Sequence, residues 1–572
     1  MRRAPIYTLR RSFLVALFMI ALGGLFVRAV YLQLFENEFL EGEGKARHLR
    51  VVEMPAHRGM ILDRNGELLA VSTPIYSVWA NPSTALSNHE SVRRVASILN
   101  LNAADLIKKL TQKNDRQFLY VKRQVEPQQA EQLKQANFAG VHLQREYRRY
   151  YPTAEVTSHV LGFTDIDDKG LEGIELAYEK WLRGQPGAKK VIKDQLNRIV
   201  EDVEGIRIPQ PGQDITLSLD RRVQYLAYRE LKAKLAQHRA RSASAVMLDA
   251  RTGEVVAMAN VPAFNPNNRK GYQRHTYRNR AVTDVFEPGS TIKPFIIASA
   301  LESNRYSPNT LINTTPGTYK VGDHTIRDAK DFGQLTVSNV IIKSSNVGAT
   351  KIALTIPPQT LWSTFSAIGI GQSTESGFPG EVGGHLKNFQ DWHEVERATL
   401  AFGYGMSVTT LQLARAYAVL AAGGKRLPVS MLRVADADLN RINAPRVFST
   451  QTADEVIKML TAVVTTYGTG SRAAIPGYSV AGKTGTVHKS AKGGYEENKY
   501  VSVFAGIAPA SDPQLVLVVM VNEPSRGAYF GGEVAAPIFS KIMGGALRIL
   551  NVAPDDVPLQ ADSNDLVQDH AG

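Results

Sequence analysis

The first group of residues able to do chemistry is a serine followed three positions later by a lysine, Ser290 and Lys293. A serine hydroxyl becomes a strong nucleophile when a base takes its proton, and a desolvated lysine with a lowered pKa can be that base. The preceding Gly289 and the apolar residues 295–298 predict a helix start, with both side chains on one face and the serine at the positive end of the helix dipole. A serine that only caps a helix would give the same local pattern.

The second group is Ser344-Ser345-Asn346, which follows a mainly apolar stretch, 340–343, and precedes a helical segment, 347–354. This arrangement predicts a polar turn between two buried helices, from which a hydroxyl and an amide can point into a cleft. Taken alone, the motif fits an ordinary turn between helices equally well.

The third group is Lys-Thr-Gly-Thr at residues 483–486. Residues 477–484 also match the phosphate-binding pattern G-x-x-x-x-G-K-[ST], which requires a buried strand before it and a helix after it. Pro476 disfavours a central strand, and Gly485 and the β-branched residues that follow disfavour a helix. We therefore predict an edge strand leading into a loop, and nucleotide binding remains a remote alternative.

The three groups occur in the order Ser-x-x-Lys, Ser-x-Asn, Lys-Thr-Gly, each in a fitting context of helix start, turn and strand. Together they form the motif set of penicillin-binding proteins and class A β-lactamases. The chain has no cysteine, which excludes thiolate chemistry. The zinc-protease-like fragment 393–396 is followed by Arg397 where the second histidine ligand is needed. We expect no metal and no cofactor.

The elements that must position these motifs lie at both ends of one long segment. A strand at 215–219, an amphipathic helix from about Arg221 and a hairpin over 245–259 begin it. Strands at 500–507 and 514–521 and a helix at 537–550 end it. We therefore predict one α+β domain at 216–552 whose sheet is assembled from both ends.

The N-terminus predicts a membrane anchor. Four arginines within residues 1–11 precede an apolar run, 12–35, that is long enough to span a bilayer if Arg28 lies near the far interface. The positive flank indicates a cytoplasmic tail, so the remainder faces outward. A cleaved signal peptide is the alternative, but no clear small-x-small site follows the run.

Residues 36–215 mix short strands, helices and turns, and they contain no catalytic group that we recognise. An Asn-Gly turn at 65–66 predicts a hairpin, 101–112 and 127–135 have helical spacing, and a helix beginning at Gly173 should end before Gly184. We predict a spacer or docking module, called the pedestal below. The polar, acidic segment 553–572 predicts a disordered tail.

The composition is that of a globular protein, with 44% hydrophobic and 21% charged residues among 572. The net charge of +13 is dispersed along the chain, which suits a membrane surface or an acidic polymer. No basic helix or aromatic-basic motif accompanies it, so we expect no nucleic-acid partner.

The chain resembles class B penicillin-binding proteins, specifically the division-type, penicillin-binding-protein-3-like transpeptidases. The resemblance is carried by the anchor, by residues 58–66, by the region 162–175, by the approach to the nucleophile at 287–290 and by the C-terminal strands. It implies an antiparallel five-stranded sheet flanked by helices, placed after a transmembrane helix and an elongated mixed α/β pedestal of the dimerisation type. It also implies that the domain cross-links peptidoglycan stem peptides in septal wall synthesis.

The resemblance further implies a role for each motif residue. Ser290 would form the acyl-enzyme, Lys293 would accept its proton, and Ser344 would relay a proton to the leaving D-alanine. The backbone N–H groups of Ser290 and Thr486 would form an oxyanion hole. The implied substrate-binding residues are Asn346, Lys483, Thr484, Gly485, Thr486, Tyr404, Tyr529 and Phe530. For the three aromatic residues, core packing is an alternative.

The implied partners are lipid-linked stem peptides, β-lactam antibiotics, the inner membrane, a membrane glycosyltransferase and other divisome proteins, with the catalytic domain in the periplasm. A non-enzymatic β-lactam sensor or division scaffold remains an alternative. A β-lactamase is disfavoured because the segment most similar to its Glu-x-x-Leu-Asn element, residues 436–440, begins with aspartate.

Overall fold

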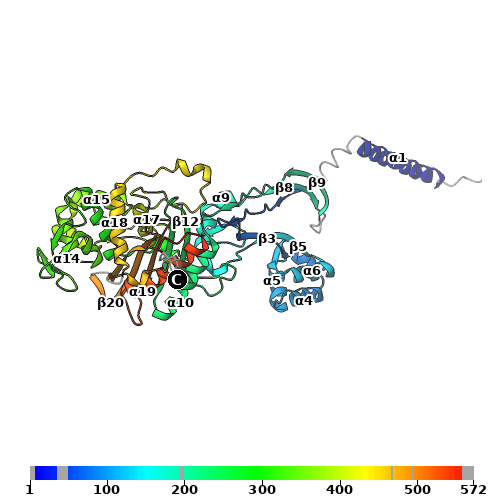
Figure 1. Cartoon of the computed structure of the whole chain (residues 1–572). Coiled ribbons are helices and arrows are strands. Elements are labelled where there is room, and N and C mark those ends of the chain that lie inside the picture. The colour runs from blue at the N-terminus through cyan, green and yellow to red at the C-terminus, as the bar shows by residue number, and fades with distance from the viewer. Residues whose placement is uncertain (1–6, 35–48, 194–198, 466–467, 492–493, 557–572) are drawn as a thin grey trace, which may run out of the picture. The chain divides into compact units, whose positions relative to one another are not determined.

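The computed structural model describes residues 7–34, 49–193, 199–465, 468–491 and 494–556 (Figure 1). Contacts divide the chain into two compact units. The first unit comprises residues 1–57, 74–148 and 184–212, and the second comprises 58–73, 149–183 and 213–572. Most of the predicted disordered tail lies outside the described residues, although Asp555 accepts a hydrogen bond from the Ser479 backbone N–H.

The second unit is built on a five-stranded sheet in which every neighbouring pair is antiparallel. Its strands, in spatial order, are β12 (Val255–Val261), β11 (Ser242–Asp249), β21 (Leu515–Asn522), β20 (Gly494–Ala508) and β19 (Ala481–Ala491). The central strands are buried on both faces, which explains their continuous apolar runs. The predicted sheet, assembled from the two ends of the domain, is confirmed.

Helices cover both faces of this sheet. On one face, α10 (Arg221–His238) and α19 (Gly531–Ile549) pack against each other and against the strands. On the other face, α17 (Thr410–Ala421) packs against β11 and β21. The carboxylate of Asp220 caps α10 and so fixes the predicted start near Arg221.

The last helix begins earlier than predicted. We expected it to begin at Pro537. Instead α19 starts at Gly531, and Pro537 lies inside it. Val534, Ala535 and Ala536 are fully buried in the core, so tertiary packing extends the helix across the proline.

Seven further helices of the second unit surround the sheet and frame the site residues. They are α11 (Arg280–Thr283), α12 (Lys293–Glu302), α13 (Val337–Ile342), α14 (Asn346–Thr355), α15 (Pro358–Ala367), α16 (Glu394–Leu400) and α18 (Thr450–Val463). Helix α12 packs against α14 and α18, and α18 packs against β19, so the three motifs are carried by elements in contact.

Part of the predicted pedestal belongs to the second unit. The hairpin of β2 (Ile61–Leu62) and the start of β3 (Leu68–Ala80) turns at Gly66, whose φ is +82°. The predicted helix from Gly173 is split into α8 (Gly173–Ala177) and α9 (Glu179–Leu182) at Tyr178. Strand β10 covers only Ile215–Thr216, and the residues that follow it also pair with segment 431–432.

Buried ion pairs hold this part of the chain together. The Arg58 guanidinium lies 2.7 Å from Glu175 and 2.6 Å from Glu179, and Arg149 lies 2.6 Å from the other oxygen of Glu175. Arg58, Arg149 and Glu175 are all buried, so each charge depends on the others for compensation.

The first unit contains the N-terminal helix and an α/β body. The body includes α4 (His89–Ile98), α5 (Ala103–Gln112) and α6 (Pro127–Ala136), together with β4 (Leu119–Val125). A three-stranded sheet is formed by β1 (Leu49–Met54), β8 (Gly187–Lys193) and β9 (Ile199–Arg207). The helical spacing seen at 101–112 and 127–135 thus corresponds to α5 and α6.

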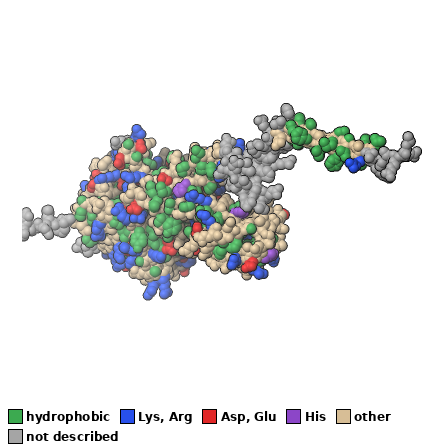
Figure 2. Space-filling model, turned by 90° about the vertical axis from the view of Figure 1, so that its right-hand side faces the viewer, with side chains coloured by type: hydrophobic (Ala, Val, Ile, Leu, Met, Phe, Trp, Pro, Cys, Tyr) green, Lys and Arg blue, Asp and Glu red, His purple; other side chains and the backbone are tan. Residues whose placement is uncertain are grey.

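Helix α1 (Tyr7–Leu34) includes a candidate membrane span, Leu9–Gln33, with a mean hydropathy of 2.4. Apolar side chains cover its length (Figure 2). No other helix among the described residues is both long and apolar enough to cross a membrane. The predicted N-terminal apolar helix is confirmed, and it is compatible with a membrane anchor.

Candidate active site

Ser290 lies in a short 3₁₀ turn, Gly289–Ile292, that runs directly into α12. We expected the serine on an α-helical first turn, but the α-helix itself begins at Lys293. A spacing of three residues still places two side chains on one side of the turn, because side chains three apart are eclipsed in a 3₁₀ turn. Gly289 has a φ of +56°, and a Cβ there would lie 2.5 Å from Val487 Cγ1, so the turn packs tightly on β19.

Lys293 is completely buried, and its ammonium group is held by the Ser-x-Asn motif. Its Nζ donates to the Ser344 carbonyl at 2.6 Å and to Asn346 Oδ1 at 2.8 Å, and it lies 3.3 Å from Ser344 Oγ. Burial lowers the pKa of Lys293 well below its usual value, and the positive charge of Lys483 lowers it further, while Asp328 acts in the opposite direction. A lysine in this environment favours its neutral, basic form.

The Ser290 hydroxyl is partly exposed, and it makes no hydrogen bond within the part of the chain that the structure describes. The direct Ser290 to Lys293 hydrogen bond of an activated pair is therefore not formed here. Catalytic hydrogen bonds are often long in unliganded sites and tighten when substrate binds.

Ser344 lies in the turn between α13 and α14 with a φ of +59°, which is unusual for a residue other than glycine. Its hydroxyl lies 2.9 Å from Lys483 Nζ and 3.3 Å from Lys293 Nζ. Such a backbone conformation costs about 1–3 kcal/mol and persists only where the surroundings enforce it. Here it places one hydroxyl between two lysines.

Asp328 positions this turn, and sequence reasoning missed it. Its carboxylate accepts hydrogen bonds from Ser345 Oγ and the Asn346 N–H, both at 2.5 Å, and from the Val347 N–H at 3.1 Å. It thereby binds the positively polarised start of α14. Asp328 lies 16 residues before Ser344 in no recognisable motif, so no local signal could have identified it.

Lys483 is carried by β19, the edge strand of the sheet, and it is completely buried. Burial lowers the pKa of Lys483 to about 7. Its Nζ contacts Ser344 Oγ and also lies 3.2 Å from the Thr484 carbonyl. The predicted edge strand is confirmed.

The predicted loop after this strand is wrong. Strand β19 continues to Ala491, because Thr486, Val487 and His488 pair with successive residues of β20. No helix follows Thr484, so the resemblance of residues 477–484 to a phosphate-binding loop is coincidental.

The other residues of this motif face the turn that carries Ser290, called the nucleophile turn after the role predicted for Ser290, and the start of α19. A Cβ at Gly485 would lie 3.0 Å from the Pro288 carbonyl, so glycine permits this close approach. Thr484 Oγ1 lies 3.1 Å from Thr469 Oγ1, and Thr486 Oγ1 accepts the Gly531 N–H at 2.8 Å. Thr469 is a second site neighbour that the sequence did not reveal.

The three predicted aromatic residues belong to two groups. The Tyr404 ring makes an edge contact with the Tyr495 ring, with 5.5 Å between the ring centroids. Tyr404 follows Gly403, where an added Cβ would lie 2.2 Å from the Gly289 carbonyl oxygen. Burial raises the pKa of Tyr404. Tyr404 therefore stands next to the nucleophile turn.

Tyr529 and Phe530 directly precede α19. Tyr529 stacks on Tyr500 at 4.1 Å and lies 4.4 Å from the Phe530 ring. Phe530 is 52% exposed, which argues against core packing at that position. The structure thus brings together the three polar motifs and places the aromatic residues near the same elements.

Comparison with known proteins agrees with this geometry. Residues 243–544 match the family described as the penicillin-binding protein transpeptidase domain, and residues 53–217 match the penicillin-binding protein dimerisation domain. The chain belongs to the class B penicillin-binding proteins. The resemblance to division-type enzymes is confirmed by the relatives that follow.

The chain is 42% identical over 563 residues to peptidoglycan D,D-transpeptidase FtsI of Escherichia coli K12, covering 98% of this chain and 94% of that one. It is 41% identical over 551 residues to the probable peptidoglycan D,D-transpeptidase PbpC of Pseudomonas aeruginosa, covering 96% and 97%.

Solved structures are also similar. The transpeptidase domain of Burkholderia pseudomallei penicillin-binding protein 3 has a TM-score of 0.55 and 44% identity, and covers 60% of this chain and 98% of that one. A peptidoglycan synthetase from Bifidobacterium adolescentis, with a TM-score of 0.70 over 90% of this chain and 99% of that one, is 24% identical and supports the fold alone.

Proposed function

We propose that this chain is a peptidoglycan D,D-transpeptidase that cross-links stem peptides through an acyl-enzyme on Ser290 during septal wall synthesis. The observation that carries the proposal is the convergence of Lys293 and Lys483 on the hydroxyl of Ser344, beside the nucleophile turn. Motifs from three distant parts of the chain form one polar cluster there.

In the first half-reaction, Ser290 Oγ attacks the carbonyl of the penultimate D-alanine of a donor stem. Neutral Lys293 takes the hydroxyl proton, and the tetrahedral oxyanion is stabilised by the backbone N–H groups of Ser290 and Thr486, at about 3 kcal/mol per donor. The peptide bond then breaks, Ser344 passes a proton to the departing D-alanine amine, and an ester remains on Ser290.

In the second half-reaction, an amine of a neighbouring stem attacks this ester. Lys293 and Ser344 take up the amine proton and return one to Ser290 Oγ, so the enzyme is regenerated and one amide bond replaces another. Asn346 binds the acyl-side amide of the donor. The subsite of Lys483, Thr484 and Thr486, with Gly485 allowing close approach, binds the terminal carboxylate.

The cleft walls and the anchor complete the proposal. Tyr404, Tyr529 and Phe530 line the cleft, and α1 crosses the inner membrane with its arginine-rich flank in the cytoplasm. The catalytic domain, 216–552, then lies in the periplasm. The pedestal, 36–215, is available to a membrane glycosyltransferase or other divisome proteins.

Covalent labelling tests the nucleophile. We expect full-length chain incubated with a fluorescent penicillin to carry a stable label on the peptide containing Ser290, and Ser290→Ala to carry none. Ser303→Ala, at the other end of α12, is the matched control and should label normally. A label elsewhere, or no label with an intact fold, would contradict the assignment.

Further outcomes separate the alternatives. Labelling without any cross-linking of stem peptides would indicate a sensor or scaffold. Rapid release of hydrolysed drug would indicate a β-lactamase, because a transpeptidase deacylates to water slowly.

A further inference from the structure

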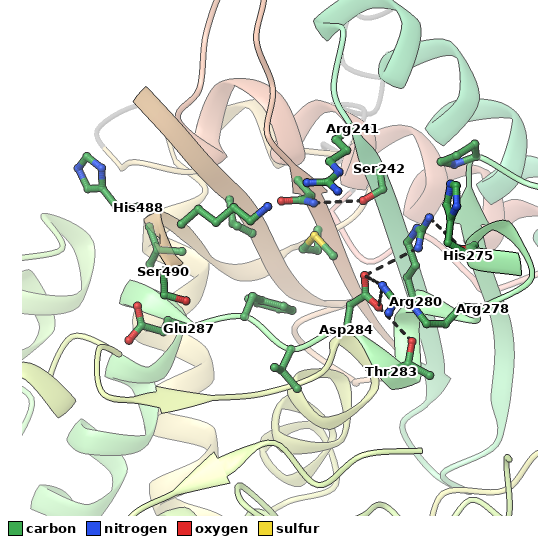
Figure 3. Close-up of a pocket in the computed structure, with 18 residues that line it drawn as sticks. Arg241, Ser242, His275, Arg278, Arg280, Thr283, Asp284, Glu287, His488 and Ser490 are labelled. Atoms are coloured by element: carbon green, nitrogen blue, oxygen red, sulfur yellow. Dashed lines mark hydrogen bonds and ion pairs between the residues drawn. The ribbon is translucent and has the colours of Figure 1, made fainter. Parts of the chain in front are cut away.

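A cavity of about 600 Å³ lies in the second unit, next to the nucleophile segment but lined by none of the catalytic motif residues (Figure 3). One wall is formed by the sheet, including Arg241, Ser242 and the part of β19 beyond the Lys-Thr-Gly motif. The facing wall is formed by residues 278–287, which lead directly to Ser290. The volume is that of an ordinary small-ligand site.

The charges of this cavity are unbalanced. On the sheet wall, Arg241 and Lys489 both pair with the single carboxylate of Glu523. On the facing wall, Arg278 lies 2.9 Å from Asp284, and Arg280 lies 3.9 Å from the same carboxylate. Two cations therefore share one carboxylate in each pair, which leaves an excess of positive charge around the cavity.

The other lining carboxylate does not offset this excess. One oxygen of Glu287 accepts the Gly405 N–H at 2.8 Å and lies 3.3 Å from the Tyr495 hydroxyl, so this side chain is engaged with the residues beside the nucleophile turn. Burial also raises the pKa of Glu287, while its hydrogen bonds with Gly405 and Tyr495 act in the opposite direction.

Arg280 is the most constrained of the four cations. It is only 9% exposed, its Nη2 donates weakly to the His275 carbonyl at 3.4 Å, and its buried Nε has no partner among the described residues. Burial lowers the pKa of Arg280, Asp284 acts in the opposite direction, and the positive charges of Arg278 and Arg241 lower the pKa further. An anion in the cavity would relieve this repulsion among the cations.

The remaining surface of the cavity is mixed, with polar side chains that include Ser242, Thr283 and Asn522 beside apolar ones. Phe286 and Val487, from opposite walls, are buried to within a few per cent, as are Val501 and Met520. A ligand that fits would therefore carry negative charge toward the cations of both walls and could hydrogen-bond to the polar side chains between them.

We propose that this cavity is a second ligand site, which binds a short peptide carrying two carboxylates, one held by Arg241 and Lys489 and the other by Arg278 and Arg280. The source of such a peptide, an acidic stretch of a peptidoglycan stem, rests on the function proposed above. Each cation pair already holds one carboxylate of the chain itself, so its geometry suits that group. Because the two pairs belong to facing walls, a ligand with two carboxylates can contact both pairs at once.

The proposal is tested with the dipeptide L-alanyl-D-glutamate. Ligand-observed NMR measures its binding to the full-length chain in detergent. Arg241→Gln combined with Arg278→Gln should weaken binding about tenfold or more. These side chains are 67% and 52% exposed, so the variant should fold and should label normally with penicillin. Equal affinity of the variant and the unmodified chain would overturn the proposal.

The matched control removes the same charge elsewhere. Arg229→Gln combined with Arg251→Gln alters two exposed, ion-paired arginines that do not line the cavity, and it should leave binding unchanged. An equal loss of binding in this control would show that net charge alone causes the effect, and it would overturn the proposed site.

Two further measurements decide location and ligand class. Prior acylation by penicillin should leave dipeptide binding intact, and its loss would place the dipeptide in the catalytic cleft instead. Inorganic pyrophosphate should bind more weakly than the dipeptide, and tighter binding would overturn the carboxylate assignment. If Ser290 does not label with penicillin but the dipeptide still binds, the proposed function is refuted and the cavity assignment stands.

Discussion

Two buried lysines meet at the hydroxyl of Ser344, so the protonation states of single residues govern the proposed chemistry. Lys293 must be neutral to accept a proton, and its buried position favours that form. Lys483 must be charged to attract a carboxylate, yet burial lowers its pKa to about 7. A higher pH therefore favours the neutral Lys293 that must accept a proton, whereas a lower pH favours the charged Lys483 that must attract a carboxylate.

The charge of Lys483 predicts a pH-dependent substrate affinity. Because its pKa is about 7, Lys483 is protonated below that pH and neutral above it. The KM for a donor with a free terminal carboxylate should therefore rise as pH increases through about 7 to 9. A donor with an amidated C-terminus, compared over the same range, should not show this rise. A flat KM for the carboxylate donor would contradict the assignment.

Asp328→Asn should impair acylation. The substitution removes the negative charge that binds the start of α14 and replaces one acceptor oxygen by a donor. We expect penicillin labelling at least about tenfold slower and a stability loss of about 1–3 kcal/mol. Asp331→Asn, an exposed aspartate of the same loop with one backbone hydrogen bond, serves as the control. Similar labelling rates in the two variants would refute the role of Asp328.

At the scale of elements, close backbone approach places the nucleophile. The turn before α12 packs between β19 and residue 403, and the glycines at these contacts leave no room for a Cβ. Sequence patterns revealed the strands, the long helices and the three motifs, because those depend on local periodicity and spacing.

Features that depend on tertiary contacts escaped sequence reasoning. The continuation of β19 to Ala491 depends on pairing with β20, and the early start of α19 depends on core packing. Asp328 and the cationic cavity arise from residues far apart in the chain, so neither leaves a local motif.

Gly289→Ala tests the tight turn. Its φ of +56° is unfavourable for alanine, and the new Cβ would lie 2.5 Å from Val487. Gly66→Ala also has a positive φ, of +82°, but its Cβ would meet no atom within 4 Å. We expect the control to lose about 1–2 kcal/mol and to label normally. Gly289→Ala should lose more stability and most penicillin labelling, and equal behaviour of the two would contradict the packing argument.

Arg58→Met tests the buried ion pairs of the second unit. It leaves Glu175 and Glu179 without their shared cation, which should cost about 3–5 kcal/mol. Arg183→Met, which removes an exposed pair with Glu179 at 3.9 Å, should cost less than about 1 kcal/mol. Chemical denaturation of both variants measures the difference, and a small loss for Arg58→Met would show that the network is dispensable.

At the scale of the whole molecule, one apolar helix precedes all folded parts of the chain that the structure describes. Its span, Leu9–Gln33, predicts that the protein remains with membranes after an alkaline wash. Deletion of residues 1–35 should release it while penicillin labelling is retained. Release of the full chain by the wash would contradict a membrane-spanning anchor.

The most direct test of the central claim is turnover on Ser290. Intact-protein mass spectrometry would follow the full-length chain with a thioester analogue of the donor peptide, before and after addition of an acceptor amine. We predict an acyl group on Ser290 that disappears when the amine is added, with one amide product formed per acyl group lost. An acyl group that ignores the amine, or that forms equally in Ser290→Ala, would contradict the account.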